Sequence, residues 1–507
     1  MNEKIRHMLL PATVFLTGAS VLVVEVVATR VLSPYFGNTI FSVSSVISVI
    51  LAALSVGYYS GGKLADKYPS LKWFFSIILI SSFILMGLHG FGQFLLPLIS
   101  AKLPITTGPL LMSMLLFFLP ALLLGTLSPF AIKLQQTLTP KQGIGSISGT
   151  MFFWSTLGSI AGSLSAGFYF IPHVGINQIM IGNSILLFLV GLIPLLFLRL
   201  SNKKFIASII LFLVFAASTT FASNVYAQRY VYQADGVYER LSIYDIERDD
   251  RPTRILLQDS TNSGATYLDT NNPSDFTYDY TKYLHLYQEQ NTPIDQALVI
   301  GGGPYSIPKA LLFELPEASV DVVEIEPSLV DLAKTYFDLS ENEHFTNIIQ
   351  DGRRFLFDSK DKYDLIFADA YGSLYSVPSH LTTQEFMQLA HDRLSENGIF
   401  IGNFIGDTYQ DGPSIIFSAM KTFNVVFDRT YYFGVQSPTQ ESAQNIIFLG
   451  VKNGQEIDFQ NPLFKDHLID TTGFDLSKHK LLTDNFAPVE YLSAQTLKRQ
   501  TKHKVKE

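Results

Sequence analysis

The first 224 residues contain a series of long apolar stretches, and these constrain the fold more than any other feature of the chain. A helix that crosses a lipid bilayer needs about 20 predominantly apolar residues. Stretches of this kind lie near residues 9–32, 38–60, 73–99, 108–132, 147–170, 176–198 and 205–223. We therefore predict a multi-pass α-helical membrane domain over residues 1–224, with about seven transmembrane helices, set in the lipid bilayer of a cell membrane.

Basic residues indicate how these helices are oriented. Cytoplasmic loops of membrane proteins are enriched in lysine and arginine. Such residues precede the first stretch and follow the second, fourth and sixth, as Lys4, Arg6, Lys63, Lys67, Lys72, Lys133, Lys141, Arg199, Lys203 and Lys204. With the N-terminus inside, an odd number of spans places everything after residue 224 outside the cell. The alternatives are a miscounted span or a last stretch that lies in the membrane interface, so the side of the second half stays open.

Polar residues and glycines within the apolar stretches have two interpretations each. Glu25 and Arg30 lie near the end of the first stretch, where a charge is by default a functional hypothesis. We favour an ion pair between them that ties helices together, or snorkelling to the interface. For His89 we favour a packed, hydrogen-bonded side chain over one that faces a cavity. For Gly158 and Gly162 we favour close helix packing over a substrate path.

Charge and cysteine content exclude several classes of function. The formal net charge is −8, so we expect no nucleic-acid partner, which would need a basic face. The chain contains no cysteine, and disulfides, thiolate metal sites and cysteine nucleophiles are therefore excluded. We expect no metal.

The second half alternates between strand and helix patterns. Apolar strands are predicted at 297–300, 320–325, 364–368, 399–404 and 445–451, with helices between them, for example at 327–337 and 383–394. This alternation is typical of an α/β domain whose parallel sheet is covered by helices on both faces. We assign residues 291–507 to this domain. The preceding residues 225–290 show short strands and turn signals, which indicate a small β subdomain.

A glycine turn follows the first of these strands, in the sequence ALVIGGGPYSIP. The strand leads directly into Gly301, Gly302 and Gly303, and a helix pattern follows. Such a turn holds a dinucleotide pyrophosphate, a nucleoside sulfonium such as S-adenosylmethionine, or nothing. Pro304 removes one of the backbone N–H groups that a pyrophosphate requires, which favours the sulfonium nucleoside over NAD.

Acidic residues follow three successive strands of the predicted sheet. Glu324 comes about 20 residues after the glycines, where an acid binds ribose hydroxyls in doubly wound folds, and Glu326 can substitute for it. Asp351, followed by Gly352, ends the next strand, where an Asp can bind an adenine amino group. Asp369 ends the strand at 364–368, at the edge where ligands of open α/β sheets bind.

Together these motifs resemble one family. IGGGPYSIPKAL, VVEIEPSLVDLAKTYF, QDGRRFL and YDLIFADAYGS are similar to the spermidine synthase (polyamine aminopropyltransferase) family over roughly residues 230–450. EVVATRVLSPYFG, GYYSGGKLADKYP, VPSHLTTQEF and LLTDNFAPVEYL resemble its membrane-fused members, in which a multi-pass domain comes first. The resemblance implies a Rossmann-like domain of the class I methyltransferase/spermidine synthase type behind a small β subdomain, and suggests a homodimer.

The resemblance also implies a reaction and a donor site. Family members transfer an aminopropyl group from decarboxylated S-adenosylmethionine to a small-molecule amine such as putrescine, giving spermidine and methylthioadenosine. By resemblance, Gly301 to Gly303 bind the methionine-derived part of this co-substrate and Glu324 binds the ribose. Asp351 and Gly352 bind the adenine end.

On the acceptor side, the resemblance implies that Asp369 is the catalytic base and also binds the amine. A carboxylate within reach can orient the amine, take its proton and stabilise positive charge near the sulfonium. Tyr278 matches a tyrosine that lines the amine pocket, although a core tyrosine is an equal alternative.

The chain departs from the family pattern at several positions. Pro304 and Gly372 stand where the family has Asp, and Asp279-Tyr280 stands in place of His-Glu. An early Gln corresponds to Asn262 or Ser263. Several of these groups pair with a diamine, so the sequence supports the cofactor site better than a putrescine site.

Replacement charge for the amine has three candidates. They are Asp279, Asp484 and Glu490. For each one, a helix cap or a surface carboxylate is the favoured interpretation. Two other functions stay open: a methyltransferase that uses S-adenosylmethionine itself, and a non-catalytic membrane sensor or transporter of polyamines.

Overall fold

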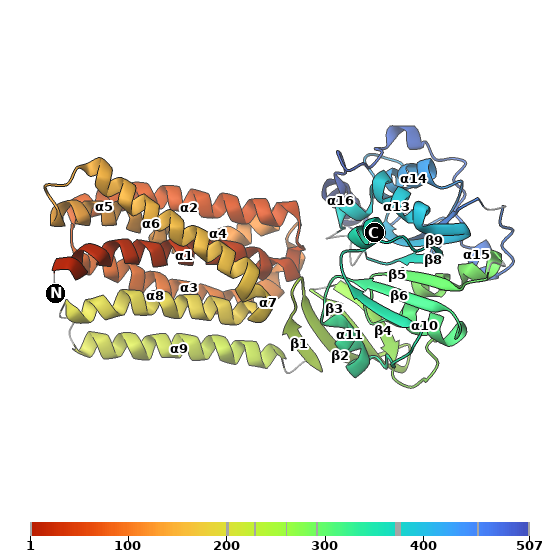
Figure 1. Cartoon of the computed structure of the whole chain (residues 1–507), viewed down its shortest axis with the longest axis horizontal. Helices are drawn as coiled ribbons and strands as arrows, with labels where there is room; N and C mark the ends of the chain where they lie inside the picture. Colours follow the sequence, from red (N-terminus) through yellow and green to blue (C-terminus); the bar gives the residue numbers. More distant parts are fainter. Residues whose placement is uncertain are drawn as a thin grey trace. The chain divides into compact units, whose positions relative to one another are not determined.

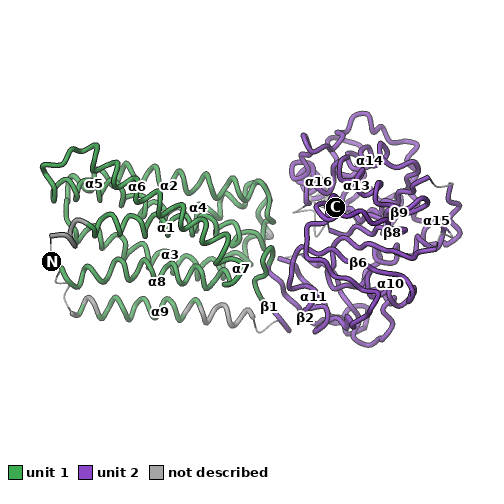
Figure 2. The backbone as a smooth tube through the Cα atoms, in the orientation of Figure 1, with its two compact units in different colours: residues 1–229, 234–239 green, residues 230–233, 240–507 purple. Residues whose placement is uncertain are grey.

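The structure is a computed structural model that describes residues 3–198, 202–227, 230–259, 261–290, 293–370, 377–453 and 456–504. The chain divides into two compact units, which are coloured separately in Figure 2. The helical unit comprises residues 1–229 and 234–239, and the C-terminal unit comprises residues 230–233 and 240–507.

Long helices run side by side in the helical unit (Figure 1). They are α1 (Glu3–Phe36), α2 (Ile40–Lys67), α3 (Leu71–Ile99), α4 (Gly108–Gly125), α5 (Leu127–Leu138), α6 (Ile144–Ser165), α8 (Ile176–Phe197) and α9 (Asn202–Ala227). Helix α6 continues through a π-helical turn, η2 (Ala166–Phe170), into the short α7 (Ile171–His173), and η1 (Ser100–Lys102) follows α3. All of the predicted spans fall on helices.

Five helical segments in the described part of the chain are long and apolar enough to cross a membrane, judged by length and composition. They are Met8–Phe36, Ile40–Lys67, Leu71–Ile99, Gly108–Leu138 and Ile176–Phe197. The other two predicted spans lie on α6 and α9. Helix α6 is rich in glycine and serine, and the apolar part found in α9 is the shorter segment Ile206–Ala217. The predicted count of about seven therefore has support for five spans and stays a prediction for the spans on α6 and α9.

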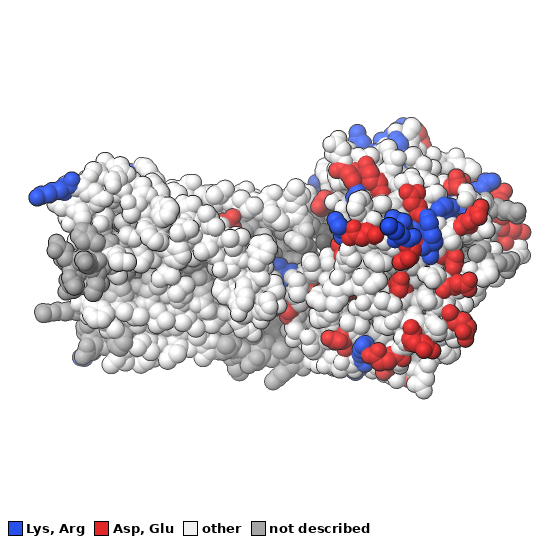
Figure 3. Space-filling view, viewed as in Figure 1, with Lys and Arg blue, Asp and Glu red and all other residues white. Residues whose placement is uncertain are grey.

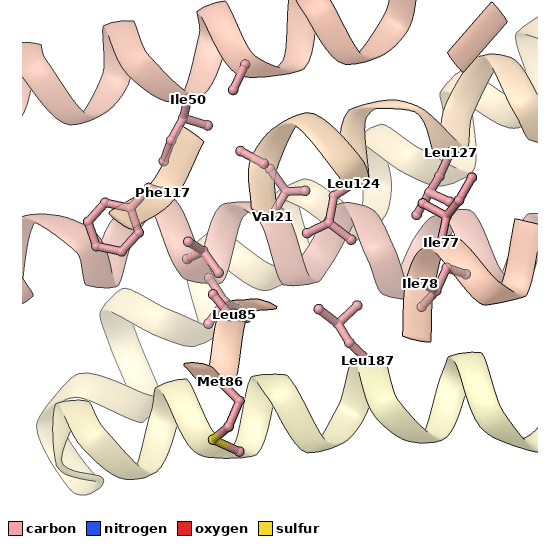
Figure 4. Packing of buried hydrophobic residues seen from close by; sticks show 14 of the residues in the cluster. Val21, Ile50, Ile77, Ile78, Leu85, Met86, Phe117, Leu124, Leu127 and Leu187 are labelled. Atoms are coloured by element: carbon pink, nitrogen blue, oxygen red, sulfur yellow. The ribbon is translucent and has the colours of Figure 1, made fainter. Parts of the chain in front are cut away.

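Apolar side chains fill the space between these helices. Figure 4 shows Val21 of α1, Ile50 of α2, Leu85 of α3, Phe117 of α4 and Leu187 of α8 converging in one cluster, and all five are buried. Large apolar side chains also lie exposed on the outside of the same helices, and Figure 3 shows few charges over the visible face of this unit. Helices that are apolar on all sides are typical of a membrane domain.

Glycines let α1 and α6 approach closely. A Cβ atom at Gly158 would lie 2.0 Å from the carbonyl oxygen of Phe15, and one at Gly162 would lie 2.3 Å from that of Ala19. Real Cβ atoms do not come so near to backbone oxygens, so only glycine fits here. Small residues at a helix interface are the usual way in which membrane helices bring their backbones together. These contacts fit the predicted packing role of Gly158 and Gly162.

The polar residues of the helical unit have other partners than those predicted. Arg30 Nη2 donates a hydrogen bond to the carbonyl oxygen of Gly236 at 3.0 Å, and the described residues show no ion pair with Glu25. The predicted Glu25–Arg30 pair is therefore wrong. His89 is buried, with its Nε2 3.0 Å from Gln93 Nε2, and it also lines a small cavity.

The C-terminal unit contains two sheets. The small one has the strand order β1-β2-β3-β4 and consists of β1 (Tyr232–Asp235), β2 (Arg240–Arg248), β3 (Arg251–Gln258) and β4 (Thr261–Tyr267). Strand β3 pairs antiparallel with β2 and with β4. A 3-10 helix, η3 (Asp279–Gln290), follows this sheet and carries residues of the site described below.

The large sheet has seven strands in the order β10-β11-β9-β8-β5-β6-β7. Its strands are β5 (Gln296–Ile300), β6 (Ser319–Glu324), β7 (Phe345–Ile349), β8 (Tyr363–Ala368), β9 (Leu394–Gly406), β10 (Arg429–Gly434) and β11 (Gln444–Val451). Strand β5 pairs in parallel with β6 on one side and with β8 on the other. The chain therefore leaves β5 in one direction and later returns to its other side. This reversal creates a switch point, and ligands of such sheets bind outside the carboxyl ends of the strands there.

Helices cover both faces of the large sheet. They are α10 (Ser306–Glu314), α11 (Leu329–Tyr336), α12 (Gly352–Asp358), α13 (Gln384–Arg393), α14 (Ile415–Val426), α15 (Pro462–Lys465) and α16 (Val489–Lys504), with the 3-10 turns η4 (Ser379–Leu381) and η5 (Leu476–Lys478). Two separate clusters of buried apolar residues lie against the sheet, one containing Val299 and Val322 and the other Leu298 and Ile300. Alternate residues of β5 thus face opposite layers, as a sheet buried on both faces requires.

One predicted strand direction is wrong. The segment 445–451 was expected in a parallel sheet, but β11 pairs antiparallel with both β9 and β10. Strand β10 was not predicted, and a short connection joins it to β11. A short connection permits only antiparallel neighbours, because a parallel pair needs a long crossover.

A buried ion pair attaches the last helix to the large sheet. Arg499 of α16 donates from Nε and Nη2 to the two carboxylate oxygens of Asp407, at 2.9 and 2.8 Å. The side chain of Asp407 is fully buried just after the end of β9. A buried carboxylate requires such a partner, and a bidentate arginine is the strongest kind.

The glycine contacts between α1 and α6 generate a stability prediction. Gly158→Ala should lower the free energy of unfolding of the detergent-solubilised protein by about 1–3 kcal/mol, because the new methyl group overlaps the Phe15 carbonyl. Gly149→Ala is the matched control in the same helix, since a Cβ there meets nothing within 4 Å. This control should be neutral or more stable by up to about 1 kcal/mol. Equal thermal midpoints for the two variants would contradict the packing role.

Candidate active site

The glycine turn lies at the switch point, between the ends of β5 and β8. Gly301 and Gly303 adopt φ angles of +97° and +51°, which side chains rarely tolerate. A Cβ atom at Gly301 would lie 2.6 Å from the carbonyl oxygen of Asp369, and one at Gly302 would lie 2.6 Å from the ring of Tyr305. The backbone angles of the turn and the segments packed on it therefore allow only glycine at these positions. Its bare backbone suits the close approach of a ligand.

Glu324 ties this turn to the end of β6. Its carboxylate accepts hydrogen bonds from the backbone N–H groups of Gly302 and Glu326, both at 2.8 Å. The side chain is 6% exposed, and burial raises its pKa although these hydrogen bonds oppose the shift. The acid predicted to bind ribose is thus brought to the glycine turn, as the order of the strands required. Its contact with a ribose stays a prediction.

Asp351 caps α12 and has a second partner that the sequence did not indicate. Its Oδ1 accepts from the Arg354 backbone N–H at 2.9 Å, and its Oδ2 lies 2.8 Å from His380 Nε2. The hydrogen bond from His380 is the main reason that the pKa of Asp351 is lowered. An adenine amino group would share this carboxylate with His380.

Packing leaves no room for a side chain at Gly352, which is next to Asp351. A Cβ atom there would lie 2.4 Å from Cγ2 of Ile300, the last residue of β5. The start of α12 therefore lies directly against the strand that leads into the glycine turn. This contact supports the predicted location of Gly352 at the nucleoside site, and its role in binding stays a prediction.

Asp369 follows β8, and a network of neutral groups holds it. Asn403 of β9 donates from Nδ2 to Asp369 Oδ1 at 2.9 Å, and Asn445 of β11 donates to Asn403 Oδ1 at 2.9 Å. The phenol of Tyr280 also lies near this carboxylate and favours its ionised form. Part of Asp369 stays accessible, but desolvation of its carboxyl group raises the pKa to about 6, against the opposing effect of Asn403 and Tyr280.

Tyr278 directly precedes η3, and Tyr280 lies in its first turn. Their rings stack with centroids 6.1 Å apart, and the Arg248 guanidinium lies 4.6 Å from the Tyr278 centroid. Since Tyr280 lies near Asp369, the stacking brings Tyr278 to the same region of the unit. Sequence reasoning selected Tyr278 and treated Tyr280 only as a departure from the family pattern. The contact with Asp369 depends on folding between distant segments, which no local pattern reveals.

The small sheet packs on the glycine turn. A Cβ atom at Gly264 of β4 would lie 2.4 Å from the Pro304 ring, and one at Gly303 would lie 3.2 Å from the Ser263 carbonyl oxygen. Of the two residues predicted to replace the early Gln, Ser263 thus adjoins the turn. Asn262 accepts from the hydroxyl of Tyr244 at 3.4 Å.

The structure assigns other partners to two of the three replacement acids. Asp279 pairs with Lys282 at 2.7 Å and is mostly exposed. Asp484 pairs with Arg353, whose Nη1 lies 2.6 Å from Oδ1. Neither carboxylate is free for an amine, so the interpretation as structural or surface acids fits. Glu490 lies in the first turn of α16, and Gly372 lies outside the described residues.

Comparisons with known proteins identify a domain that contains most of this site. Residues 280–461 match the family model described as the spermine/spermidine synthase domain. Residues 280–461 are therefore spermidine synthase-like. The predicted resemblance is thereby confirmed for this part of the chain, which includes Gly301 to Gly303, Glu324, Asp351, Gly352 and Asp369 but not Tyr278.

Curated relatives match only part of the chain. A polyamine aminopropyltransferase of Vibrio vulnificus is 31% identical over 161 residues, which are 31% of this chain and 50% of that protein. An N-terminal histidine N-methyltransferase of Emericella nidulans is 29% identical over 180 residues, which are 34% of this chain and 31% of that protein. The chain thus spans about half the length, or less, of these relatives. The structure of a probable spermidine synthase from Corynebacterium glutamicum aligns with a TM-score of 0.40 and 16% identity, over 45% of this chain and 82% of that one.

The contacts of Glu324 generate a binding prediction. Glu324→Ala should weaken binding of methylthioadenosine by about tenfold or more, because it removes the ribose acceptor and leaves two backbone N–H groups without theirs. Isothermal titration calorimetry on the detergent-solubilised protein measures this. Glu343→Ala is the control, since the Glu343 side chain is almost fully exposed. Equal affinity in wild type and Glu324→Ala would contradict the ribose role.

Proposed function

We propose that the synthase-like unit transfers an aminopropyl group from decarboxylated S-adenosylmethionine to an amine and releases methylthioadenosine. The observation that carries this proposal is Asp369, a carboxylate with a raised pKa that lies beside the glycine turn at the switch point of the sheet. The match to the spermine/spermidine synthase domain and the aminopropyltransferase relatives support the choice of donor.

In the proposed reaction, Asp369 acts as the base. The amine nitrogen loses a proton to the carboxylate and attacks the propyl carbon next to sulfur. The carbon–sulfur bond breaks, and its electron pair stays on sulfur, which changes from a sulfonium to a neutral thioether. A pKa of about 6 suits this role, because the group is mostly ionised at neutral pH and can still accept a proton. Asn403 orients the carboxylate.

The donor is proposed to bind across the carboxyl ends of β5, β6 and β7. Gly301 to Gly303 are proposed to hold the sulfonium and its side chain against their backbone. Glu324 accepts hydrogen bonds from the ribose hydroxyls, and Asp351 with Gly352 holds the adenine. This order follows the order of the strands in the sheet.

The finer assignments are proposals as well. Putrescine as acceptor and spermidine as product follow from the family resemblance. We propose that the helical unit holds the enzyme in a cell membrane, and five apolar helices of sufficient length support this. The homodimer suggested by the resemblance also stays a proposal.

Pro304 favours one alternative reaction. Its ring packs on Gly264, so the turn offers no carboxylate at position 304 for the ammonium group of a decarboxylated donor. A methyltransferase that uses S-adenosylmethionine would not need that carboxylate, and one relative is an N-methyltransferase. Mass spectrometry separates the two reactions, because a methyltransferase releases S-adenosylhomocysteine instead of methylthioadenosine. Binding of either nucleoside without any product would indicate a sensor or transporter.

Asp369→Asn tests the proposed base. The variant should lose about 10²–10⁴-fold in the rate of methylthioadenosine release, because the amide cannot take the proton. Calorimetry should show nearly unchanged binding of methylthioadenosine, which does not need the base. Asp411→Asn changes an exposed aspartate on the loop after β9 and should keep the wild-type rate. A fully active Asp369→Asn variant would refute the assignment.

The raised pKa of Asp369 predicts a pH dependence. The carboxylate must be ionised to accept a proton, so kcat/KM should fall as the pH is lowered through about 6. An unperturbed aspartate would place this decline near pH 4. Initial rates from pH 4.5 to 8.5 measure it, with thermal midpoints at each pH as a control for unfolding. A rate that is constant down to pH 4.5 would rule out the raised pKa.

A further inference from the structure

Two sequence motifs that the proposed reaction does not use, VPSHLTTQEF and LLTDNFAPVEYL, meet in the C-terminal unit. The backbone N–H of Gln384 in the first motif donates to the carbonyl oxygen of Leu482 in the second at 2.8 Å. The hydroxyl of Thr383 donates to Asp484 Oδ1 at 2.9 Å, across 101 residues of chain. The two motifs therefore fold against each other, although they are far apart in the sequence.

Arg353, in the first turn of α12, connects both motifs to His380. Its Nη1 donates to Asp484 Oδ1 at 2.6 Å, and its Nη2 donates to Oδ2 of the same carboxylate. Nη1 also donates to Thr383 Oγ1 at 3.4 Å and to the carbonyl oxygen of His380 at 3.1 Å. A bidentate pair of arginine and carboxylate fixes the orientation of the guanidinium. The backbone of η4 at His380 is thereby held against the start of α12.

The side chain of His380 reaches Asp351, the residue that precedes α12. Its Nε2 lies 2.8 Å from Asp351 Oδ2, while Oδ1 accepts from the Arg354 backbone N–H at 2.9 Å. The carboxylate is thus held in one orientation from two sides. An ionised carboxylate oxygen can still accept a second hydrogen bond. The side chain of Asp351 is 31% exposed and that of His380 is 46% exposed, so a ligand can reach both.

We infer that His380 is a positioning residue that makes the site specific for adenine; the inference rests on the proposed function, which places adenine at Asp351. The imidazole holds Asp351 Oδ2 where this oxygen accepts a hydrogen bond from the amino group of the base. The two motifs contribute by holding the backbone of His380 through Arg353. Hypoxanthine has a carbonyl oxygen in place of the amino group, so it would set one acceptor against another. A site built to bind an N–H group rejects an analogue that lacks it.

Calorimetry on the full-length protein in detergent tests the inference with methylthioadenosine and with methylthioinosine, which carries hypoxanthine. The wild type should bind methylthioadenosine at least about tenfold more tightly. In His380→Ala this ratio should fall by about fivefold, because binding of methylthioadenosine weakens while the weak binding of methylthioinosine stays almost unchanged. His380→Gln keeps a side-chain N–H donor and should retain most of the preference. His344→Ala is the control, since His344 precedes β7 at the end of that strand away from Asp351.

The outcomes distinguish this inference from the proposed function. An equal loss of affinity for both nucleosides in His380→Ala would indicate a merely structural role and overturn the inference. Tighter binding of methylthioadenosine by this variant would mean that the imidazole blocks the carboxylate, which would overturn the inference as well. In both cases, release of methylthioadenosine from decarboxylated S-adenosylmethionine by the wild type would leave the proposed function intact. A wild type that binds neither nucleoside would overturn both.

Discussion

The contact between the glycine turn and the end of β8 is the constraint on which the site depends. The backbone N–H of Asp369 donates to the carbonyl oxygen of Ile300 at 2.9 Å, and the next residue, Gly301, has no room for a side chain against Asp369. The two strands therefore continue to pair up to the point where the chain turns away. One hydrogen bond and one missing Cβ atom bring the proposed base and the proposed donor site together. The positions of the glycine turn and of Asp369 thus follow directly from the pairing of β5 with β8.

The meeting of strand ends at one edge of the sheet also explains why much of the site could be predicted from the sequence. In a parallel sheet, residues that end successive strands share an edge, so Glu324, Asp351 and Asp369 could be grouped without a structure. Local patterns sufficed because each residue ends its own strand. The direction of β11 could not be predicted in this way. An apolar run of this length is equally compatible with a parallel and an antiparallel strand. Only the short connection to β10 shows that β11 is antiparallel.

The residues that surround the predicted ones were beyond sequence reasoning. His380, Asn403 and Asn445 reach the site through contacts across 29, 34 and 42 residues of chain, respectively. Such residues carry no local signal, because an asparagine on a strand reads as an ordinary polar residue. The Glu25–Arg30 interpretation failed for a related reason. Two opposite charges five residues apart on a helix suggest each other as partners, yet Arg30 bonds to the carbonyl of Gly236.

The ion pair between Arg499 and Asp407 has a consequence for the order in which the C-terminal unit folds. Asp407 lies on the chain just beyond β9, the strand that carries Asn403 and so orients Asp369. A chain that has been synthesised only as far as α15 contains this buried carboxylate without its arginine, and an unpaired buried charge opposes folding. The end of β9 is therefore completed only when the last helix has been made. Formation of the proposed catalytic centre is in this way linked to the C-terminal residues that include Arg499.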